Sequence, residues 1–317
     1  MSAQIGGLHH VTAIAGEAQR NFDFYTRTLG LRLVKKTVNF DDPATYHLYY
    51  GDGLGNPGTL LTFFPWKGAP QGRKGTGETE ATALAVPAGS LEFWRERLQP
   101  FLTSSEITER FGERVLAFAD PDGMALEIVE TSIDEDVRTG WTESEVPSDY
   151  AIRGLHAVTL ALRDWESTVR CLTGILGFEE IGTEGGRRRF VTQRGVPGNV
   201  VDLVERPDLP PSQTLVGSVH HVAFRLPDDA VQADWQHKLL DARLGVTEVR
   251  EREYFRSIYF HEPGRVLFEL ATDAPGFATD ETPDALGTAL KLPPWLEARR
   301  ASIENALPAL DTNLERN

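Results

Sequence analysis

The sequence has very little cysteine: Cys171 is the single one among 317 residues. An internal disulfide is therefore excluded, and so is a cysteine cluster that could hold an iron–sulfur centre for electron delivery. Cys171 itself stands in a helix-like stretch, where a buried structural thiol is favoured over a nucleophile. No nucleotide-binding fingerprint is found either. Thiol chemistry and reductant cofactors are thus removed from the candidate functions.

Long apolar runs and an excess of basic charge are also missing. No apolar run approaches the roughly 18 to 20 residues of a membrane-spanning helix, and Met1–Gln4 has neither the basic nor the apolar part of an export signal. The chain carries 47 acidic against 32 basic residues, for a net charge of −15, which disfavours nucleic acid and anionic lipid as partners. We therefore expect a globular cytoplasmic protein that is long enough for two domains.

A short strand pattern recurs at four places along the chain, which indicates internal repetition. The four openings are Leu8–Thr12, Ala81–Ala85, Leu155–Thr159 and Val219–Ala223. Each is followed by an amphipathic helix, which we predict over Ala18–Leu29, Ser90–Leu98, Trp165–Leu176 and Asp229–Leu240. Several short β-rich runs complete each unit, so the repeat is βαβββ.

The four units fall into two kinds, which predicts a duplicated two-unit domain. Units one and three share a glycine after the helix, which suits a helix C-cap, and units two and four share a proline that ends the opening strand. We predict an N-terminal domain over 1–135 and a C-terminal domain over 150–275, joined by a polar linker at Thr131–Asp149. An extension over 276–317 should contain a capping helix from about Pro293 to Leu310.

Two positions in each unit can be compared as candidate metal ligands. One lies in the first strand, and the other lies in the last strand, aligned on the proline of the preceding turn. The resulting pairs are His10 and Phe63 in unit one, Ala81 and Glu127 in unit two, Ala157 and Leu203 in unit three, with Asp202 one step away, and His221 and Glu269 in unit four. Units one and four together supply two imidazoles and one carboxylate.

His10, His221 and Glu269 have the composition of a facial triad for Fe(II), which leaves coordination positions open for substrate and O2. A lone histidine on an apolar strand is usually a hydrogen-bonded core residue. An ionised Glu269 in the apolar strand 266–270, however, costs several kcal/mol unless it is paired or bound to a cation. Since ligands lie about 2 Å from a metal, we predict that unit one pairs with unit four and unit two with unit three. Glu127, which has no histidine opposite it, is interpreted as a structural remnant.

The four βαβββ units resemble the vicinal oxygen chelate superfamily of glyoxalase I, extradiol dioxygenases and antibiotic-resistance binders. The match is close to the hydroquinone and chlorohydroquinone 1,2-dioxygenase branch, over nearly the whole chain, through Gly7–Thr12, Thr37–Pro43, Tyr46–Asp52 and Arg256–Phe260. The resemblance implies an α+β fold of two curved-sheet pseudo-barrels. It also implies an Fe(II) centre, replaceable by Mn(II), that binds an aromatic diol and O2 and opens the ring beside a hydroxyl. Ordinary extradiol catechol dioxygenases take their first histidine from unit three, where this chain has Ala157, which favours the hydroquinone-type branch.

Further residues are candidates for the surroundings of the metal. Thr12 lies two residues after His10, so the period of a strand directs it into the same cavity. The resemblance implies that Tyr259 and Arg252 contact the substrate or its hydrogen-bond network. His9 and His220 match residues that the branch uses near its site, although alternation should direct both away from the metal. For these two, an acid/base or supporting role and a structural hydrogen bond stay open.

The remaining histidines and the pocket wall receive weaker assignments. Tyr49, together with Phe63, is a candidate for the substrate pocket, whereas His47 is interpreted as structural. His156, His237 and His261 are assigned no role. Two rival functions also remain: a glyoxalase-like lyase or isomerase, which usually has a fourth ligand where Phe63 stands, and a metal-free binder, which would have lost the triad. The ring substituents, the choice between hydroquinone and catechol, and a homo-oligomeric state are left open.

Overall fold

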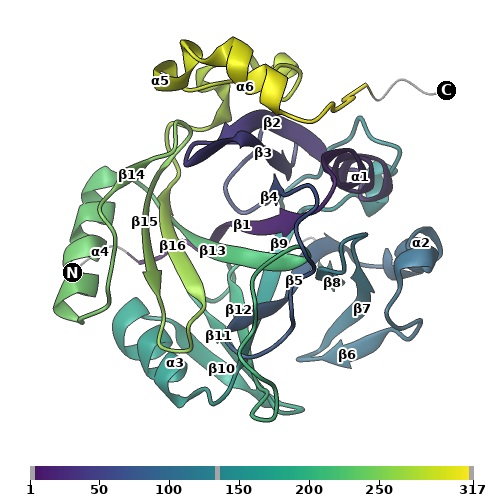
Figure 1. Ribbon diagram of the computed structural model, residues 1–317. Helices are drawn as coiled ribbons and strands as arrows, with labels where there is room; N and C mark the ends of the chain where they lie inside the picture. Colours follow the sequence, from purple (N-terminus) through teal and green to yellow (C-terminus); the bar gives the residue numbers. More distant parts are fainter. Residues whose placement is uncertain (1–3, 133–135, 314–317) are drawn as a thin grey trace.

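The computed structural model describes residues 4–132 and 136–313. Their strands form two strongly curved sheets of eight strands each (Figure 1). The first sheet has the order β14-β15-β16-β13-β1-β4-β3-β2. Its strands are β1 (Leu8–Ala15), β2 (Arg32–Asn39), β3 (Asp42–Gly51), β4 (Leu60–Pro65), β13 (Ser218–Leu226), β14 (Arg250–Glu251), β15 (Arg256–His261) and β16 (Leu267–Thr272).

The second sheet has the order β10-β11-β12-β9-β5-β8-β7-β6. Its strands are β5 (Glu78–Pro87), β6 (Thr108–Arg110), β7 (Glu113–Ala119), β8 (Ala125–Thr131), β9 (Gly154–Leu162), β10 (Glu179–Glu184), β11 (Arg187–Val191) and β12 (Val200–Glu205). The predicted α+β class with two curved sheets is therefore confirmed.

The pairing of the units is also as predicted. β1 of unit one runs antiparallel to β13 of unit four, with Val11 opposite Val222, and β5 of unit two runs antiparallel to β9 of unit three. Each sheet thus takes strands from both halves of the chain. The division into domains 1–135 and 150–275 stays a prediction about the sequence, and residues 133–135 of the expected linker lie outside the described residues.

Each predicted unit helix is present after its first strand. They are α1 (Ala18–Asp23) with a following π-helical turn η1 (Phe24–Thr28), α2 (Leu91–Arg97), α3 (Glu166–Arg170) with a π-helical turn η4 (Cys171–Leu176), and α4 (Asp229–Asp241). Gly177 ends the third helix with φ of +79°, a conformation that costs glycine little because it has no Cβ. Asp228 caps α4 by accepting a hydrogen bond from the Val231 N–H, as N-cap residues do. Single 3₁₀ turns occur at η2 (Gln99–Phe101), η3 (Ser148–Tyr150), η5 (Phe277–Thr279) and η6 (Pro283–Ala285).

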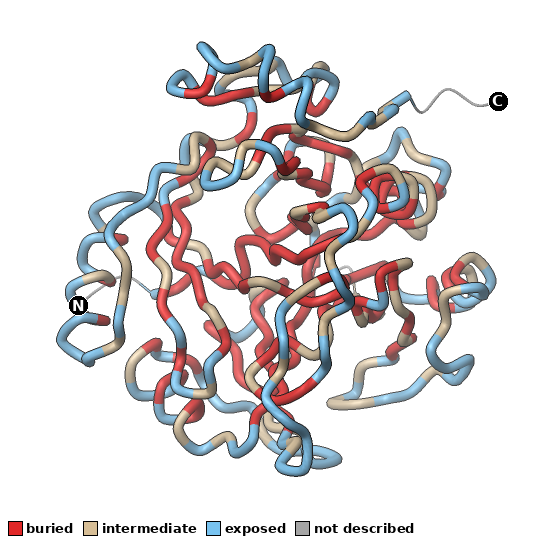
Figure 2. The backbone as a smooth tube through the Cα atoms, in the orientation of Figure 1, coloured by how far each residue is buried: buried red, intermediate tan, exposed pale blue. Residues whose placement is uncertain are grey.

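The central strands are buried on both faces, and the exposed residues gather in the helices and connections (Figure 2). All eight residues of β1 are buried, because the sheet is covered by helices on one side and curves around its own interior on the other. Cys171 is buried in the main core, as expected. Burial raises the pKa of its thiol to about 12, so the thiol stays protonated. Within the described residues, no helix has both the length and the apolar character needed to cross a membrane.

The C-terminal extension lies over β2 and β3 (Figure 1). A single capping helix from Pro293 to Leu310 is not what forms. The structure has two short helices, α5 (Pro294–Glu297) and α6 (Arg300–Ala306), because Arg299 between them leaves the helical conformation at φ −106° and ψ 5°. Leu296 and Ile303 from these helices pack on Val38 of β2.

Candidate metal centre

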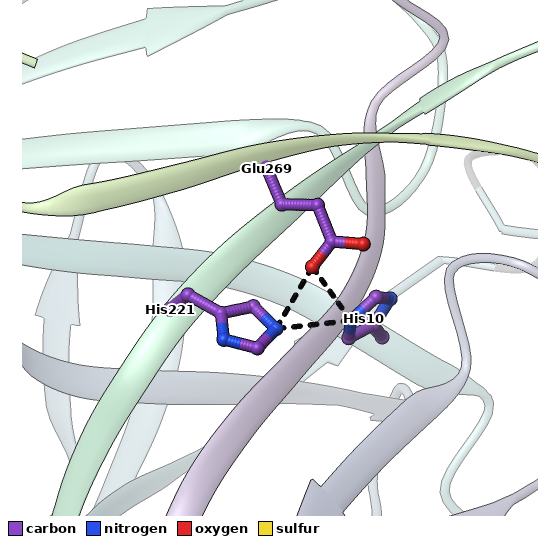
Figure 3. A group of neighbouring side chains, drawn as sticks. All are labelled: His10, His221 and Glu269. Carbon is purple, nitrogen blue, oxygen red and sulfur yellow. Dashed lines mark hydrogen bonds and ion pairs between the residues drawn. The ribbon is translucent and has the colours of Figure 1, made fainter. Parts of the chain in front are cut away.

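Three neighbouring strands of the first sheet supply the candidate ligands. His10 lies on β1, His221 on β13 and Glu269 on β16, and β13 is hydrogen-bonded to both of the other strands. The three side chains point toward one another from these strands (Figure 3). The predicted meeting of the first and last units therefore brings these residues to one place.

The ligand atoms converge closely. His10 Nε2 and His221 Nε2 are 3.3 Å apart, and Glu269 Oε2 lies 3.4 Å from the first and 2.9 Å from the second. One ligand atom from each residue lies within 4.8 Å of the others, and all three residues are buried.

The surroundings of Glu269 indicate whether the site suits a cation. Its side chain is fully buried. Ser257 Oγ donates a hydrogen bond of 2.5 Å to Oε1, whereas Oε2 receives no hydrogen bond from any described residue and faces the two imidazoles. Burial alone would raise the pKa of Glu269, but His10 and His221 hold it well below its usual value. An ionised carboxylate in a dry interior requires a counter-ion.

The two imidazoles suit the same purpose. Burial lowers the pKa of His221, against the opposing effect of Glu269, so burial favours the neutral ring that binds metals. Two imidazole nitrogens and one carboxylate oxygen form a ligand set for a divalent transition metal that leaves further coordination positions open. The residues present therefore fit such an ion.

The sheet register corrects two of the compared positions. Glu269 is paired with Ala223, two residues after His221, and the neighbour of Thr12, two residues after His10, is Thr62 rather than Phe63. In unit three the corresponding residue is Asp202, paired with Thr159, rather than Leu203. The turns of units one and three are one residue shorter between proline and strand, so alignment on the proline overshoots by one.

Phe63 consequently does not belong to the substrate pocket. Its side chain packs against the rings of Tyr25 and Tyr50 in the core, because neighbouring residues of a strand face opposite ways. Thr62, its neighbour, faces the site and shares a hydrogen bond of 2.7 Å with Thr12. The expected direction of Thr12 agrees with this contact.

His9 and His220 both touch a candidate ligand. His9 Nδ1 lies 2.9 Å from His10 Nδ1, and His220 Nδ1 lies 2.8 Å from His221 Nδ1. Strict alternation would direct these rings away, but the register of β1 against β13 shifts at His9, between Leu8 and His10, and at His220, where Thr12 and Ala13 face His221 and Val219. Such bulges redirect side chains. When Nε2 of each ligand binds a metal, its proton stands on Nδ1 and is donated to the adjacent histidine. Burial lowers the pKa of His220 to about 3, which keeps that acceptor neutral.

His47 lies in the cavity wall, although the sequence suggested a structural residue. His47 Nδ1 shares a hydrogen bond of 2.8 Å with Tyr49 OH, and His47 Nε2 shares one of 2.9 Å with Thr62 Oγ1. Burial lowers the pKa of His47 well below its usual value. A neutral imidazole, held through both ring nitrogens, thus lines the cavity beside Tyr49.

Tyr259 and Arg252 lie on the other side of the metal position. Tyr259 is paired with Glu269 across β15 and β16, and its ring centroid is 5.6 Å from that of His221. Arg252 Nε donates to Tyr259 OH at 3.2 Å, and its Nη1 donates to Asp41 at 3.1 Å. Burial, together with the charge of Glu269, raises the pKa of Tyr259, so the phenol stays protonated.

These residues surround a cavity of about 590 Å³. The walls missed by sequence reasoning are largely aromatic and include Phe64, Trp66 and Phe255. Phe255 contacts the rings of both His9 and His10. Ser257, the partner of Glu269, could have been found, because it lies two residues from Tyr259 on the same face of β15.

Comparison with known proteins agrees with this geometry. A family model described as the Glyoxalase/Bleomycin resistance protein/Dioxygenase superfamily matches residues 7–128 and 154–270. The chain belongs to this superfamily.

Relatives within the superfamily extend over nearly the whole chain. The protein named "Putative ring-cleaving dioxygenase MhqO" of Bacillus subtilis is 48% identical over 97% of each chain. The chlorohydroquinone/hydroquinone 1,2-dioxygenase of Sphingobium indicum is 38% identical over 93% of each chain. A crystal structure titled as a "putative dioxygenase" from Bacillus subtilis matches 98% of this chain and 99% of its own, with a TM-score of 0.91 and 46% identity.

In the second sheet, the positions equivalent to the three candidate ligands do not form a metal-binding set. The positions equivalent to the two histidines are Ala81 and Ala157, which offer no ligand. Glu127, the equivalent of Glu269, is instead bound through both oxygens by Arg110, and Asp202 is bound in the same way by Arg189. A structural role for Glu127 agrees with this ion pair.

Proposed function

We propose that this chain is a ring-cleaving dioxygenase that uses Fe(II), with Mn(II) as a substitute, to open a hydroquinone-type aromatic diol with O2. The ligands in this proposal are His10, His221 and Glu269. The observation that carries it is the convergence of three ligand atoms at a cavity large enough for an aromatic substrate. The names and near-complete coverage of the relatives support the reaction class.

The ion and the protein would divide the work. A bound Fe(II) with two imidazole ligands and one carboxylate ligand keeps open positions at which a diol and O2 can meet and exchange electrons. Phe255, Phe64 and Trp66 offer apolar faces to the ring and exclude water from it. The remaining polar residues then act on the hydroxyls of the substrate.

Two groups of residues suit proton and charge handling. His47 is neutral and hydrogen-bonded through its two ring nitrogens to Tyr49 and Thr62, so it suits a positioning role that holds the Tyr49 hydroxyl in the cavity wall beside the substrate. Tyr259 is a protonated phenol, and Arg252 beside it is a fixed cation. Together they would stabilise negative charge that develops on oxygen.

The alternative superfamily functions have less support. A glyoxalase-like lyase or isomerase usually has a fourth ligand, and the corresponding residue, Thr62, is a hydroxyl engaged with Thr12 and His47. A metal-free binder has no need for the buried, ionised Glu269. The preference for hydroquinone over catechol, a cytoplasmic location and a homo-oligomeric state stay predictions.

Metal retention and oxygen uptake test the proposal. Protein loaded with Fe(II) without oxygen should retain about one iron per chain and then consume O2 with hydroquinone or catechol, placing both atoms of ¹⁸O2 in the product. Glu269→Gln should lose the iron and the activity, whereas the matched control Glu127→Gln should keep both, since it alters the equivalent position of the second sheet. If none of the diols supports oxygen uptake, the proposed dioxygenase activity is wrong. If the two variants retain equal amounts of iron, the assignment of Glu269 as a ligand is wrong.

A further inference from the structure

We propose that the substrate ring carries a short side chain ending in an anionic group, and that Arg250 at the edge of the cavity binds this group. This inference rests on the proposed ring cleavage and narrows its substrate class. Arg250 would then determine specificity among diols. The argument comes from the size of the cavity, the place of Arg250 and the balance of charge.

The cavity has more room than one diol ring needs. Its volume of about 590 Å³ lies in the range of pockets that enclose ligands of several ring equivalents. A single six-membered ring with two hydroxyls and one O2 would leave much of it to water. A substituent on the ring is the simplest occupant of the remaining space.

The sheet register places Arg250 at a defined distance from the metal ligands. Arg250 on β14 is paired with Ser257, and Tyr259 on the same strand β15 is paired with Glu269. Arg250 thus lies two strands beyond β16 and two residues out of line with Glu269, or roughly 10 to 12 Å between Cα atoms in a flat sheet. Since the arginine side chain reaches back toward the cavity, a substituent of two or three carbons would span the gap.

The charge of Arg250 favours an anionic group at the end of that substituent. Three charged residues line the cavity, and Arg252 and Asp41 pair with each other. In the part of the chain that the structure describes, Arg250 has no hydrogen bond or ion pair for its side chain. A positive site in a chain of net charge −15 attracts an anion locally against the field of the whole molecule. A guanidinium binds a carboxylate through two hydrogen bonds.

A matched pair of ligands isolates this charge. 3-(2,5-Dihydroxyphenyl)propanoate and its primary amide have the same ring and stem and differ in charge at the end. We expect the iron-loaded wild type to favour the carboxylate over the amide by about fivefold in kcat/KM, equal to ~1 kcal/mol. Arg250→Gln should bring this ratio close to one.

The control is Arg163→Gln, which removes the same charge from an exposed arginine in the loop after β9. It should leave the preference for the carboxylate unchanged. The inference about Arg250 is wrong if the wild type has equal kcat/KM for the carboxylate and the amide, or if Arg250→Gln keeps the preference for the carboxylate. Oxygen uptake by the wild type on hydroquinone would still support ring cleavage in either case. If no diol supports oxygen uptake, anaerobic equilibrium binding of the same two ligands to the same variants decides on Arg250 independently.

Discussion

Ser257 holds the carboxylate of Glu269 in one orientation. Its hydroxyl donates to Oε1 and so leaves Oε2 facing the two histidines. We expect Ser257→Ala to weaken Fe(II) affinity by about 10- to 100-fold, the usual effect of removing a partner of a metal ligand. Anaerobic metal titration measures this affinity.

The control for this change is Ser218→Ala, which removes a hydroxyl from the β13 strand end, away from the three ligands. Its affinity for Fe(II) should equal that of the wild type. If Ser257→Ala also binds as tightly as the wild type, the orientation of Glu269 depends on backbone packing and not on this hydrogen bond.

At the scale of single residues, the sequence was sufficient where chemistry and strand position agree. His10, His221 and Glu269 carry both signals, and the structure brings them together. Thr62 was missed because a turn that is one residue shorter changes the register without any visible change in the strand. Strand alternation alone leaves the surroundings of His9 and His220 open, because a bulge depends on how two distant strands pair.

At the scale of elements, the C-terminal extension is tied to β2 by a buried charge. Lys35 is fully buried, and its Nζ pairs with Asp280 at 2.5 Å and with Glu281. Its ammonium also lies 4.8 Å from the ring centroid of Tyr254, which contacts Tyr49 in the cavity wall. The extension is thereby connected to the site.

Lys35→Met should therefore destabilise the folded protein strongly. Two carboxylates would be left without their cation, and breaking a buried ion pair from one side costs roughly 3 to 5 kcal/mol. Urea unfolding measures the loss, and limited proteolysis should cut first within the released extension. Adding Asp280→Asn and Glu281→Gln should recover part of the stability, and no recovery would mean that packing around the Lys35 stem dominates.

The unit helices were predictable because their periodic patterns are local. The capping helix was not, since its break at Arg299 follows from docking on Val38 and its neighbours in β2. The path of residues 276–287 over the back of the site has no local signal either. It depends on the partners of Lys35, which lie about 245 residues away in the chain.

At the scale of the whole molecule, a buried acid connects the helix of unit one to the second sheet. Asp120 follows β7 and accepts a hydrogen bond of 3.0 Å from Tyr25 OH and two more from backbone N–H groups. Burial raises its pKa to about 6, with the neighbouring Asp122 acting in the same direction. The folded protein thus favours the protonated acid.

Stability should consequently fall as the pH rises through this pKa. The contribution of protonated Asp120 is present in full below the ordinary pKa of 3.8 and is lost as the pH passes about 6, a change on the order of 3 kcal/mol. Asp120→Asn keeps the hydrogen-bonding shape without titrating. Between about pH 4 and pH 6.5 the wild type should lose stability relative to this variant in urea unfolding, and parallel curves would contradict the assignment.

The arrangement of the units could be predicted because a metal ligand set was split between the first and the last of them. His10 and Glu269 cannot bind one ion unless β1 and β16 share a sheet. The curvature that encloses the cavity had no such signal. In the curved sheet, residues from its two ends meet, as in the ion pair of Arg252 with Asp41, and these residues lie far apart in sequence.

The pairing of β1 with β13 determines when, during synthesis of the chain, the metal can bind. About 260 residues separate His10 from Glu269, so at roughly 5 to 20 residues per second a ribosome needs about 13 to 50 s to add the last ligand after the first. For most of that time, until β13 (Ser218–Leu226) has been made, β1, which is buried along its whole length in the folded protein, has no partner on its β13 side. The nascent chain therefore cannot capture iron early, and the metal enters a protein whose synthesis is nearly finished.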